Sequence, residues 1–340
     1  MSRSRMPTTA RLTLAGAAAL AMAGAALAPP SPARADPAGR PEYVALGDSY
    51  SAGVFVRRWD EQDGCGRSYR NYPHQVAERL GYALKDVTCG GAEVGDGVLQ
   101  RQPASKVYGP PTTPPKGGWS ARPAQVDALS SGTRVVTVSV GGNSIGFGSI
   151  LAKCVAEGSS SSQPAPCQDY FTSGDGAQWL KKRRDQLDRD LGHMMDVIRG
   201  RAPNAKVAVV GYPAIAAKSA GCDFLNWKQL GTIKKADISW IDRFERDVNA
   251  LLEKHATDHD ADYVDTYGPS AAHGVCESGG AKWMYGIRDD LTGDGDQADK
   301  PSEKCRKIPG TAEACTLVHP NARGLDNQAR QVIRALASGG

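Results

Sequence analysis

Two residues far apart in the sequence, Ser49 and His319, could together carry out nucleophilic catalysis. A serine hydroxyl is a poor nucleophile until a base removes its proton, and a neutral imidazole titrates in the range that this step needs. Ser49 follows Gly47 and Asp48, so a turn can expose its hydroxyl while nearby backbone N–H groups face an anion. These residue types favour acyl transfer from a carbonyl compound to the serine.

The elements that must position these residues begin with short apolar runs. Four of these runs predict buried strands, at 43–46, 134–140, 206–210 and 262–265. Residues 87–89 are a weaker candidate for a fifth strand. Apolar runs bounded by glycine are typical of a parallel sheet that is covered on both faces. Ligands of such a sheet gather at the carboxyl ends of its strands, and both Ser49 and the segment 141–144 follow a predicted strand.

Helical patterns alternate with these strands. Apolar residues at helical spacing predict helices over 72–80, 177–199 and 238–255, and Pro320 starts a last helix that runs to about residue 336. Alternation of this kind predicts an α/β fold, with helices on both sides of a doubly wound, mostly parallel sheet.

Long irregular segments interrupt the pattern at about 103–118, 154–176 and 287–317. They are polar or of low complexity, so we expect them to contribute to no core. None is a convincing linker. We therefore expect a single domain over 36–340.

The N-terminus has the composition of an export signal. Arg3, Arg5 and Arg11 precede an apolar run at 12–28, and a small-x-small cleavage pattern ends at Ala35. The alternative is a membrane anchor, but the run is near the lower length limit of roughly 17 residues for a span. We expect residues 1–35 to be a cleaved signal peptide and the protein to be secreted.

The charge balance argues against nucleic acid as a partner. The chain has 41 basic and 37 acidic residues, and the first 35 residues hold four of the arginines and no acid. The remainder is formally neutral, whereas nucleic-acid binding needs a basic surface. The basic segment 181–184 is expected to be a solvated helix face that could touch anionic lipid surfaces briefly. We expect a monomer.

Eight cysteines lie after the predicted signal peptide, where an oxidising compartment would join them as disulfides. No CxxC motif is present, which argues against zinc knuckles and thioredoxin-type redox sites. Pairing of sequence neighbours closes the shortest loops and predicts four bonds: Cys65–Cys89, Cys154–Cys167, Cys222–Cys276 and Cys305–Cys315.

Four segments in order resemble the motif blocks of the SGNH hydrolases, also called the GDSL lipase and esterase family. They read YVALGDSYSAG at 43–53, CGGA at 89–92, VSVGGNSIGF at 138–147 and VHPNARG at 318–324. The signal peptide and the spaced cysteines look most like the secreted Streptomyces-type lipases and phospholipases of this family. The resemblance implies a flavodoxin-like three-layer sandwich and hydrolysis of lipid or small-molecule esters without metal or cofactor.

The resemblance also assigns roles to individual residues. Ser49 would be the nucleophile and His319 the general base. The backbone N–H groups of Ser49 and Gly91 and the side-chain amide of Asn143 would form the oxyanion hole.

Two positions depart from the family pattern. The family has an aspartate three residues before the histidine, where this chain has Thr316. We expect a backbone carbonyl of the 315–317 stretch, that of Thr316, to orient His319, with the Asp290 carboxylate as the rival. The third block has Ser144 in place of an aspartate, which concerns support of the loop more than catalysis.

Other interpretations stay open. Residues 142–146 match the GxSxG elbow of α/β-hydrolases, which would make Ser144 the nucleophile, with Asp265 and His319 as partners. A phospholipase A or a carbohydrate acetylesterase would use the same site as a lipase. The two departures would also fit a non-catalytic binding protein, and the acidic segment from Asp290 has a weak resemblance to a calcium loop.

Overall fold

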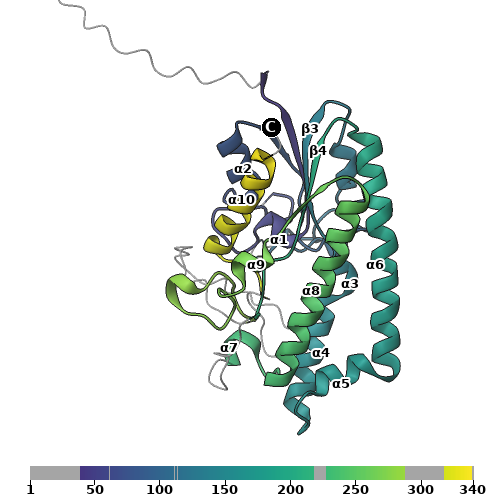
Figure 1. Cartoon of the computed structure of the whole chain (residues 1–340), viewed down its shortest axis with the longest axis vertical. Helices are drawn as coiled ribbons and strands as arrows, with labels where there is room; N and C mark the ends of the chain where they lie inside the picture. The colour runs from purple at the N-terminus through teal and green to yellow at the C-terminus, as the bar shows by residue number, and fades with distance from the viewer. Residues whose placement is uncertain are drawn as a thin grey trace, which may run out of the picture. The chain divides into compact units, whose positions relative to one another are not determined.

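The structure is a computed structural model, and it describes residues 39–60, 62–110, 112, 114–217, 227–287 and 318–338 (Figure 1). Residues 38–340 form one compact unit. The predicted signal peptide and nearly all of the predicted 287–317 loop lie outside the described residues. No helix in the described part is both long and apolar enough to cross a membrane.

Five parallel strands form the central sheet, in the order β2-β1-β3-β4-β5. Their bounds are β1 Glu42–Gly47, β2 Ala83–Asp86, β3 Thr133–Ser139, β4 Lys206–Val210 and β5 Asp262–Val264. The order reverses direction between β2 and β3, as expected for a doubly wound sheet. The predicted α/β fold with a parallel sheet is confirmed.

The predicted fifth strand at 87–89 is wrong in position, because β2 ends at Asp86. The Asp86 carboxylate accepts hydrogen bonds from the N–H and the hydroxyl of Thr88, which turns the chain out of the strand. Cys89 still donates a backbone hydrogen bond to Gly47 of β1 at 3.0 Å. β2 itself is half-buried at most and mixes charged with apolar residues, so its sequence does not read as a buried strand.

Helices cover both faces of the sheet (Figure 1). Their bounds in the described part are α1 Ser49–Ala52, α2 Tyr72–Leu80, α3 Gly142–Ile145, α4 Phe147–Ser160, α5 Pro166–Thr172, α6 Gly174–Arg201, α7 Trp227–Leu230, α8 Lys235–Asp258, α9 Tyr267–Ser270 and α10 Ala322–Ala337. Short 3₁₀ turns lie at Ala104–Lys106, Gln125–Ala128 and Gly279–Ala281.

Alternating side chains of β1 contribute to the two cores. Tyr43 and Ala45 are buried with residues of α2 and α10, whereas Val44 and Leu46 are buried with residues of α6 and α8. Successive side chains of a strand point to opposite faces, so one short strand serves both layers. The result is the predicted three-layer sandwich.

The predicted helices are present with small differences at their ends. α2 has the predicted bounds, while α6 and α8 extend beyond theirs by two or three residues at each end. α10 begins at Ala322 and not at Pro320, because Asn321 is its N-cap. The Asn321 side-chain oxygen accepts the N–H of Gly324 at 3.1 Å.

The predicted long loop at 154–176 is mostly helical, which corrects that prediction. α4 continues to Ser160, α5 begins at Pro166, and only 161–165 and residue 173 separate the three helices. The serine-rich composition hides an amphipathic pattern in which Ile150, Leu151 and Cys154 are buried. Pro166 occupies the first turn of α5, the helical position where proline is favoured.

The segment 103–118 has little regular structure, as predicted, but it does contribute to a core. Val107 is buried in a small cluster with Cys65 and Cys89, which a disulfide joins. The cysteine pair supplies apolar contacts that the composition of the segment does not reveal.

Candidate active site

Ser49 lies at the carboxyl end of β1 and is the first residue of α1. Asp48 caps this helix, since its Oδ1 accepts the N–H of Tyr50 at 2.9 Å. Gly47 is required at the turn, because its φ is +152° and a Cβ there would lie 2.6 Å from the carbonyl oxygen of Ser139. The turn leaves Ser49 only 9% exposed, at the wall of a cavity.

His319 lies beside Ser49, with its Nε2 2.8 Å from the serine Oγ. Its ring packs against those of Tyr50 and Phe55, with centroids 4.9 and 5.5 Å away. The preceding residue, Val318, has φ +55°, which is uncommon for a β-branched residue. Its carbonyl accepts the hydroxyl of Tyr50 at 2.5 Å. Tyr50, which follows Ser49, thus holds Val318, which precedes His319.

Gly91 and Asn143 line the same cavity as Ser49 and His319. The Asn143 Nδ2 donates one hydrogen bond to the carbonyl of Ala92, at 2.9 Å. An amide has a second N–H, which is available to an oxyanion. Gly91 has φ +80°, and a Cβ there would lie 2.1 Å from the carbonyl oxygen of Lys106, so another residue would force the loop apart.

Ser144 supports the loop between the second and third blocks. Its Oγ accepts the N–H of Val94 at 2.9 Å, a contact that the family's aspartate could also make. Asp265, the acid of the alternative triad, is exposed and accepts the N–H of Gly268 at 2.9 Å. His319 has Ser49 as its neighbour, so the geometry favours Ser49 over Ser144 as nucleophile.

The cavity beside the Ser49–His319 pair has a volume of about 620 Å³ and is mostly apolar. One side of α4 contributes Phe147, Gly148, Leu151 and Val155, and Ile215 faces them from the segment after β4. A pocket of this size and character suits an alkyl or acyl chain.

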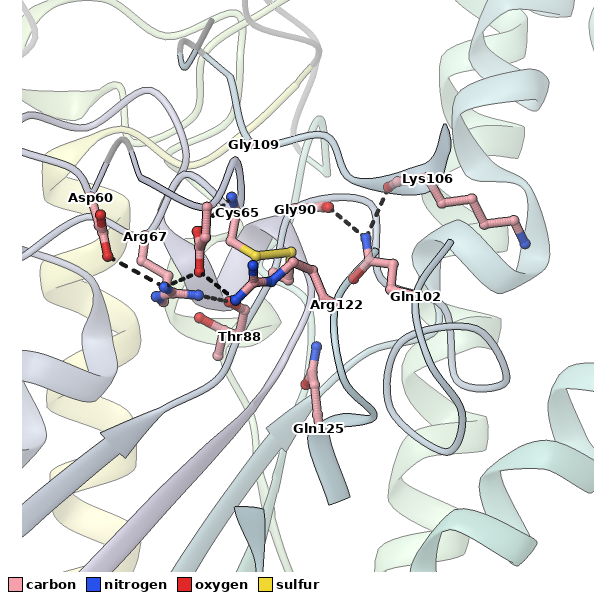
Figure 2. Close-up of a disulfide and its surroundings, with 12 residues drawn as sticks. Asp60, Cys65, Arg67, Thr88, Gly90, Gln102, Lys106, Gly109, Arg122 and Gln125 are labelled. Carbon is pink, nitrogen blue, oxygen red and sulfur yellow. Dashed lines mark hydrogen bonds and ion pairs between the residues drawn. A yellow bond between two sulfur atoms is a disulfide. The ribbon is translucent and has the colours of Figure 1, made fainter. Parts of the chain in front are cut away.

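A disulfide and two buried glutamines hold the backbone next to the candidate site residues. Cys89 is bonded to Cys65, and the carbonyl of Cys65 accepts the N–H of Gly90 at 3.0 Å. The amide of Gln102 donates to the carbonyl of Gly90 at 3.0 Å (Figure 2). Gly91 follows directly, so these contacts fix the position of its N–H.

Gln125 holds the turn before Ser49 in the same way. Its Oε1 accepts the N–H of Gly47 at 2.7 Å, and its Nε2 donates to the Gly47 carbonyl at 2.9 Å. Sequence reasoning missed both glutamines, because they lie in irregular segments where a polar residue reads as solvent-exposed.

Salt bridges lie beside the Cys65–Cys89 disulfide (Figure 2). Arg67 pairs with Asp63 and, at 3.4 Å, with Asp60, and it donates to the carbonyl of Thr88 at 3.1 Å. Arg122 adds a 3.3 Å contact to Asp63. The Asp63 and Arg67 side chains are largely buried, so this cluster anchors the segment before Gly90 to the loop at 60–68.

Two buried carboxyl groups line the cavity. Burial raises the pKa of Asp48 to about 7, against the lowering effect of the hydrogen bonds from the Tyr212 hydroxyl and the Tyr50 N–H. Burial also raises the pKa of Glu245 well above its ordinary value. The Glu245 carboxyl accepts the N–H of Ile215 at 3.1 Å, so it holds the segment after β4.

Several predicted residues lie outside the described part of the chain: Thr316, Asp290, Cys222, Cys305 and Cys315. The orientation of His319 by Thr316, the rival Asp290 and the calcium loop therefore stay predictions. The structure contains the predicted Cys65–Cys89 and Cys154–Cys167 bonds, and Cys276 is also disulfide-bonded. The pairings Cys222–Cys276 and Cys305–Cys315 stay predictions. Among the described residues, no group of three or more His, Cys, Asp or Glu side chains could hold a metal ion.

Comparisons with known proteins agree over most of the chain. The model of the GDSL-like lipase/acylhydrolase family matches residues 45–326. Lipase 2 of Streptomyces coelicolor is 33% identical over 290 residues, which are 82% of this chain and 87% of that protein. An esterase of Streptomyces scabiei is 31% identical over 359 aligned positions, covering 96% of this chain and 94% of the esterase.

Two solved structures are similar over their whole length. Phospholipase A1 from Streptomyces albidoflavus NA297 has a TM-score of 0.60 at 25% identity and matches 88% of this chain and 100% of that chain. An extracellular lipase from Streptomyces rimosus has a TM-score of 0.59 at 25% identity, with the same coverage. Each of these similarities extends over most of this chain.

Proposed function

The chain belongs to the GDSL-like lipase/acylhydrolase family, and from this premise we propose that it is a secreted hydrolase of lipid esters that uses a Ser49–His319 pair. The observation that carries the proposal is the 2.8 Å distance between Ser49 Oγ and His319 Nε2 at the wall of an apolar cavity. The family and its named lipase and esterase relatives make the chain a carboxylic ester hydrolase. The catalytic residues and the substrate are the proposed part.

In the proposed reaction, Ser49 Oγ attacks the ester carbonyl carbon while His319 Nε2 takes the hydroxyl proton. The carbonyl oxygen becomes an oxyanion, which accepts hydrogen bonds from the N–H groups of Ser49 and Gly91 and from the second N–H of the Asn143 amide. Loss of one such donor typically raises the barrier by about 2.7–4 kcal/mol.

The tetrahedral intermediate then collapses. His319 gives its proton to the alcohol oxygen, the alcohol leaves, and the acyl group stays on Ser49 as an ester. Water attacks this acyl-enzyme with His319 again as the base, which releases the carboxylic acid and restores the serine.

Secretion is supported by the predicted signal peptide, by the disulfides and by the likeness to an extracellular lipase. The apolar cavity supports a fatty acyl group as one part of the substrate. The similarity to phospholipase A1 equals that to the lipase, so phospholipids are the second substrate class to test. Parallel assays on triacylglycerols and phosphatidylcholine decide between them.

Fluorophosphonate labelling of the mature protein, followed by peptide mapping, tests the nucleophile. We expect an adduct on Ser49, no adduct in Ser49→Ala, and an adduct still on Ser49 in the matched control Ser144→Ala. An adduct on Ser144 would show that the proposed nucleophile is wrong. Absence of any adduct from a folded, disulfide-bonded protein would overturn the proposed mechanism.

A further inference from the structure

Tyr212 connects two of the four motif blocks, although it belongs to none of them. Its hydroxyl donates to the Oδ2 of Asp48 at 2.5 Å and accepts the N–H of Gly142 at 2.8 Å. Asp48 directly precedes Ser49, and Gly142 directly precedes Asn143. The Tyr212 phenol oxygen therefore joins Asp48 to Gly142, and these residues directly precede the proposed nucleophile and the proposed amide donor.

Tyr212 is itself fixed from a third part of the fold. Asn249 of α8 accepts the N–H of Tyr212 at 2.8 Å and donates to its carbonyl at 3.0 Å. The ring of Tyr50 packs edge-on against that of Tyr212, with centroids 5.1 Å apart and planes at 85°. The side chain is buried, so its hydroxyl has one well-defined position.

We propose that Tyr212 is a positioning residue of the hydrolytic site, which fixes the separation of Ser49 and Asn143; this inference rests on the proposed function. The Ser49 N–H and the Asn143 amide must point at the same oxyanion, and they come from different strand ends. Donors that are already in place need no rearrangement during the reaction. A hydrogen bond to each preceding residue supplies this placement directly.

The Asp48 carboxylate strengthens the connection. Above its pKa of about 7 this carboxyl is ionised, and hydrogen bonds to an ionised acceptor are shorter and stronger than those between neutral groups. The Tyr212 hydroxyl opposes the rise in the pKa of Asp48 that burial causes. The two groups therefore support each other, and the polarised phenol is a better acceptor for the Gly142 N–H.

Tyr212 adds to the contacts between the nucleophile turn and the third block. The Asp48 N–H donates to the carbonyl of Ser139 at 3.1 Å, which holds the turn to the end of β3, whereas Tyr212 reaches Gly142 beyond the strand. The Asn143 amide bonds to Ala92, and Ser144 accepts from Val94, so both contacts join the third block to the second. Tyr212 joins the third block to the nucleophile turn. Its loss should change the relative position of Ser49 and Asn143 while the second and third blocks stay together.

The experiment measures kcat and KM of Tyr212→Phe on a soluble chromogenic ester. We expect kcat to fall tenfold to a hundredfold with KM changed less than threefold, because the donors that Tyr212 positions bind the oxyanion of the transition state. The matched control is Tyr43→Phe, which removes a buried tyrosine hydroxyl bonded to Thr137 Oγ1 at 2.7 Å. This control should keep kcat within twofold of wild type.

A double variant separates positioning from general loosening of the fold. Asn143→Ala removes the donor that Tyr212 would position, so Tyr212→Phe should lower kcat less than threefold further in that background. A wild-type kcat in Tyr212→Phe would overturn the proposal, and so would an undiminished loss in the Asn143→Ala background. The Ser49→Ala variant tests the proposed function separately. If this variant is inactive, the proposed function stands even when the role of Tyr212 is refuted. If it is active, the proposed function itself is wrong.

A second variant covers the case in which Tyr212→Phe does not fold. Asp48→Ala breaks the same connection, because it removes the oxygen that accepts the Tyr212 hydroxyl and leaves no group that could take its place. This substitution should lower kcat in the otherwise wild-type protein and hardly at all in the Asn143→Ala background. A loss that is equal in both backgrounds would refute the positioning role.

Discussion

Replacement of Gln125 by leucine should destabilise the protein and slow catalysis, although Gln125 touches no proposed catalytic atom. The side chain is 3% exposed and makes two hydrogen bonds to Gly47, two residues before Ser49. Leucine has a similar shape and neither polar atom. The variant therefore removes both hydrogen bonds and keeps most of the packing.

The loss of stability can be estimated from the hydrogen-bond partners that the Gly47 N–H and carbonyl keep in the variant. The Gly47 carbonyl also accepts the N–H of Cys89 at 3.0 Å, so it loses one of two partners, worth about 0.5–1.5 kcal/mol. The Gly47 N–H loses its acceptor in a buried place, which costs about 1–3 kcal/mol. The free energy of unfolding should drop by about 2–4 kcal/mol, which leaves a domain of ordinary stability folded.

The assay combines urea unfolding with kinetics. The matched control is Gln328→Leu in α10, since Gln328 is fully buried and neither of its side-chain polar atoms has a hydrogen-bond partner within the described residues. This variant should be neutral or stabilising. Gln125→Leu should also lower kcat about tenfold or more, because small displacements of a nucleophile are costly. Equal unfolding midpoints for the two variants would refute the reasoning.

Two further predictions concern the cavity and its buried acid. Gly148 lines the cavity, and a Cβ there would meet no atom within 4 Å, so Gly148→Leu should fill the space. We expect kcat/KM for long acyl esters to fall about tenfold or more while that for acetate esters changes less than threefold; equal losses for both would contradict an acyl pocket. The pKa of Asp48 is raised from 3.8 to about 7, so the folded state binds the proton more tightly than the unfolded state. Proton binding by Asp48 therefore contributes fully to the free energy of unfolding below pH 4, and this contribution is lost as the pH rises to about 7. Asp48→Asn should remove this part of the pH dependence. Unfolding at pH 5 and pH 8 measures it, and an unchanged difference between the two pH values in Asp48→Asn would show that Asp48 is not its source.

The sequence allowed the sheet to be predicted where apolar runs are long and bounded by glycine, as at β3 and β4. It misplaced β2, because Lys85 and Asp86 interrupt a strand at the edge of the sheet, where burial is weak. The second half of α4 and all of α5 were predicted as a loop, because serine and glycine are poor helix formers; tertiary packing of Leu151 and Cys154 outweighs that preference.

The site was predictable to the extent that motifs carry it. Ser49, Gly91, Asn143 and His319 stand in recognisable local patterns, and the structure brings all four around one cavity. Gln102, Gln125 and Tyr212 could not be found in the same way. Their function depends on which backbone group they meet across the fold, and a lone buried glutamine or tyrosine has no local signature.

The contact between Ser49 and His319 also has a consequence for biosynthesis. The two residues are 270 positions apart, and Tyr50 reaches the same distant segment through the carbonyl of Val318. A ribosome that adds residues from the N-terminus makes the proposed nucleophile early and the proposed base almost last, many seconds later at about 5–20 residues per second. For nearly its whole synthesis the growing chain lacks the group that activates its serine. The proposed acyl transfer can therefore begin only after the C-terminal segment that carries His319 has been made.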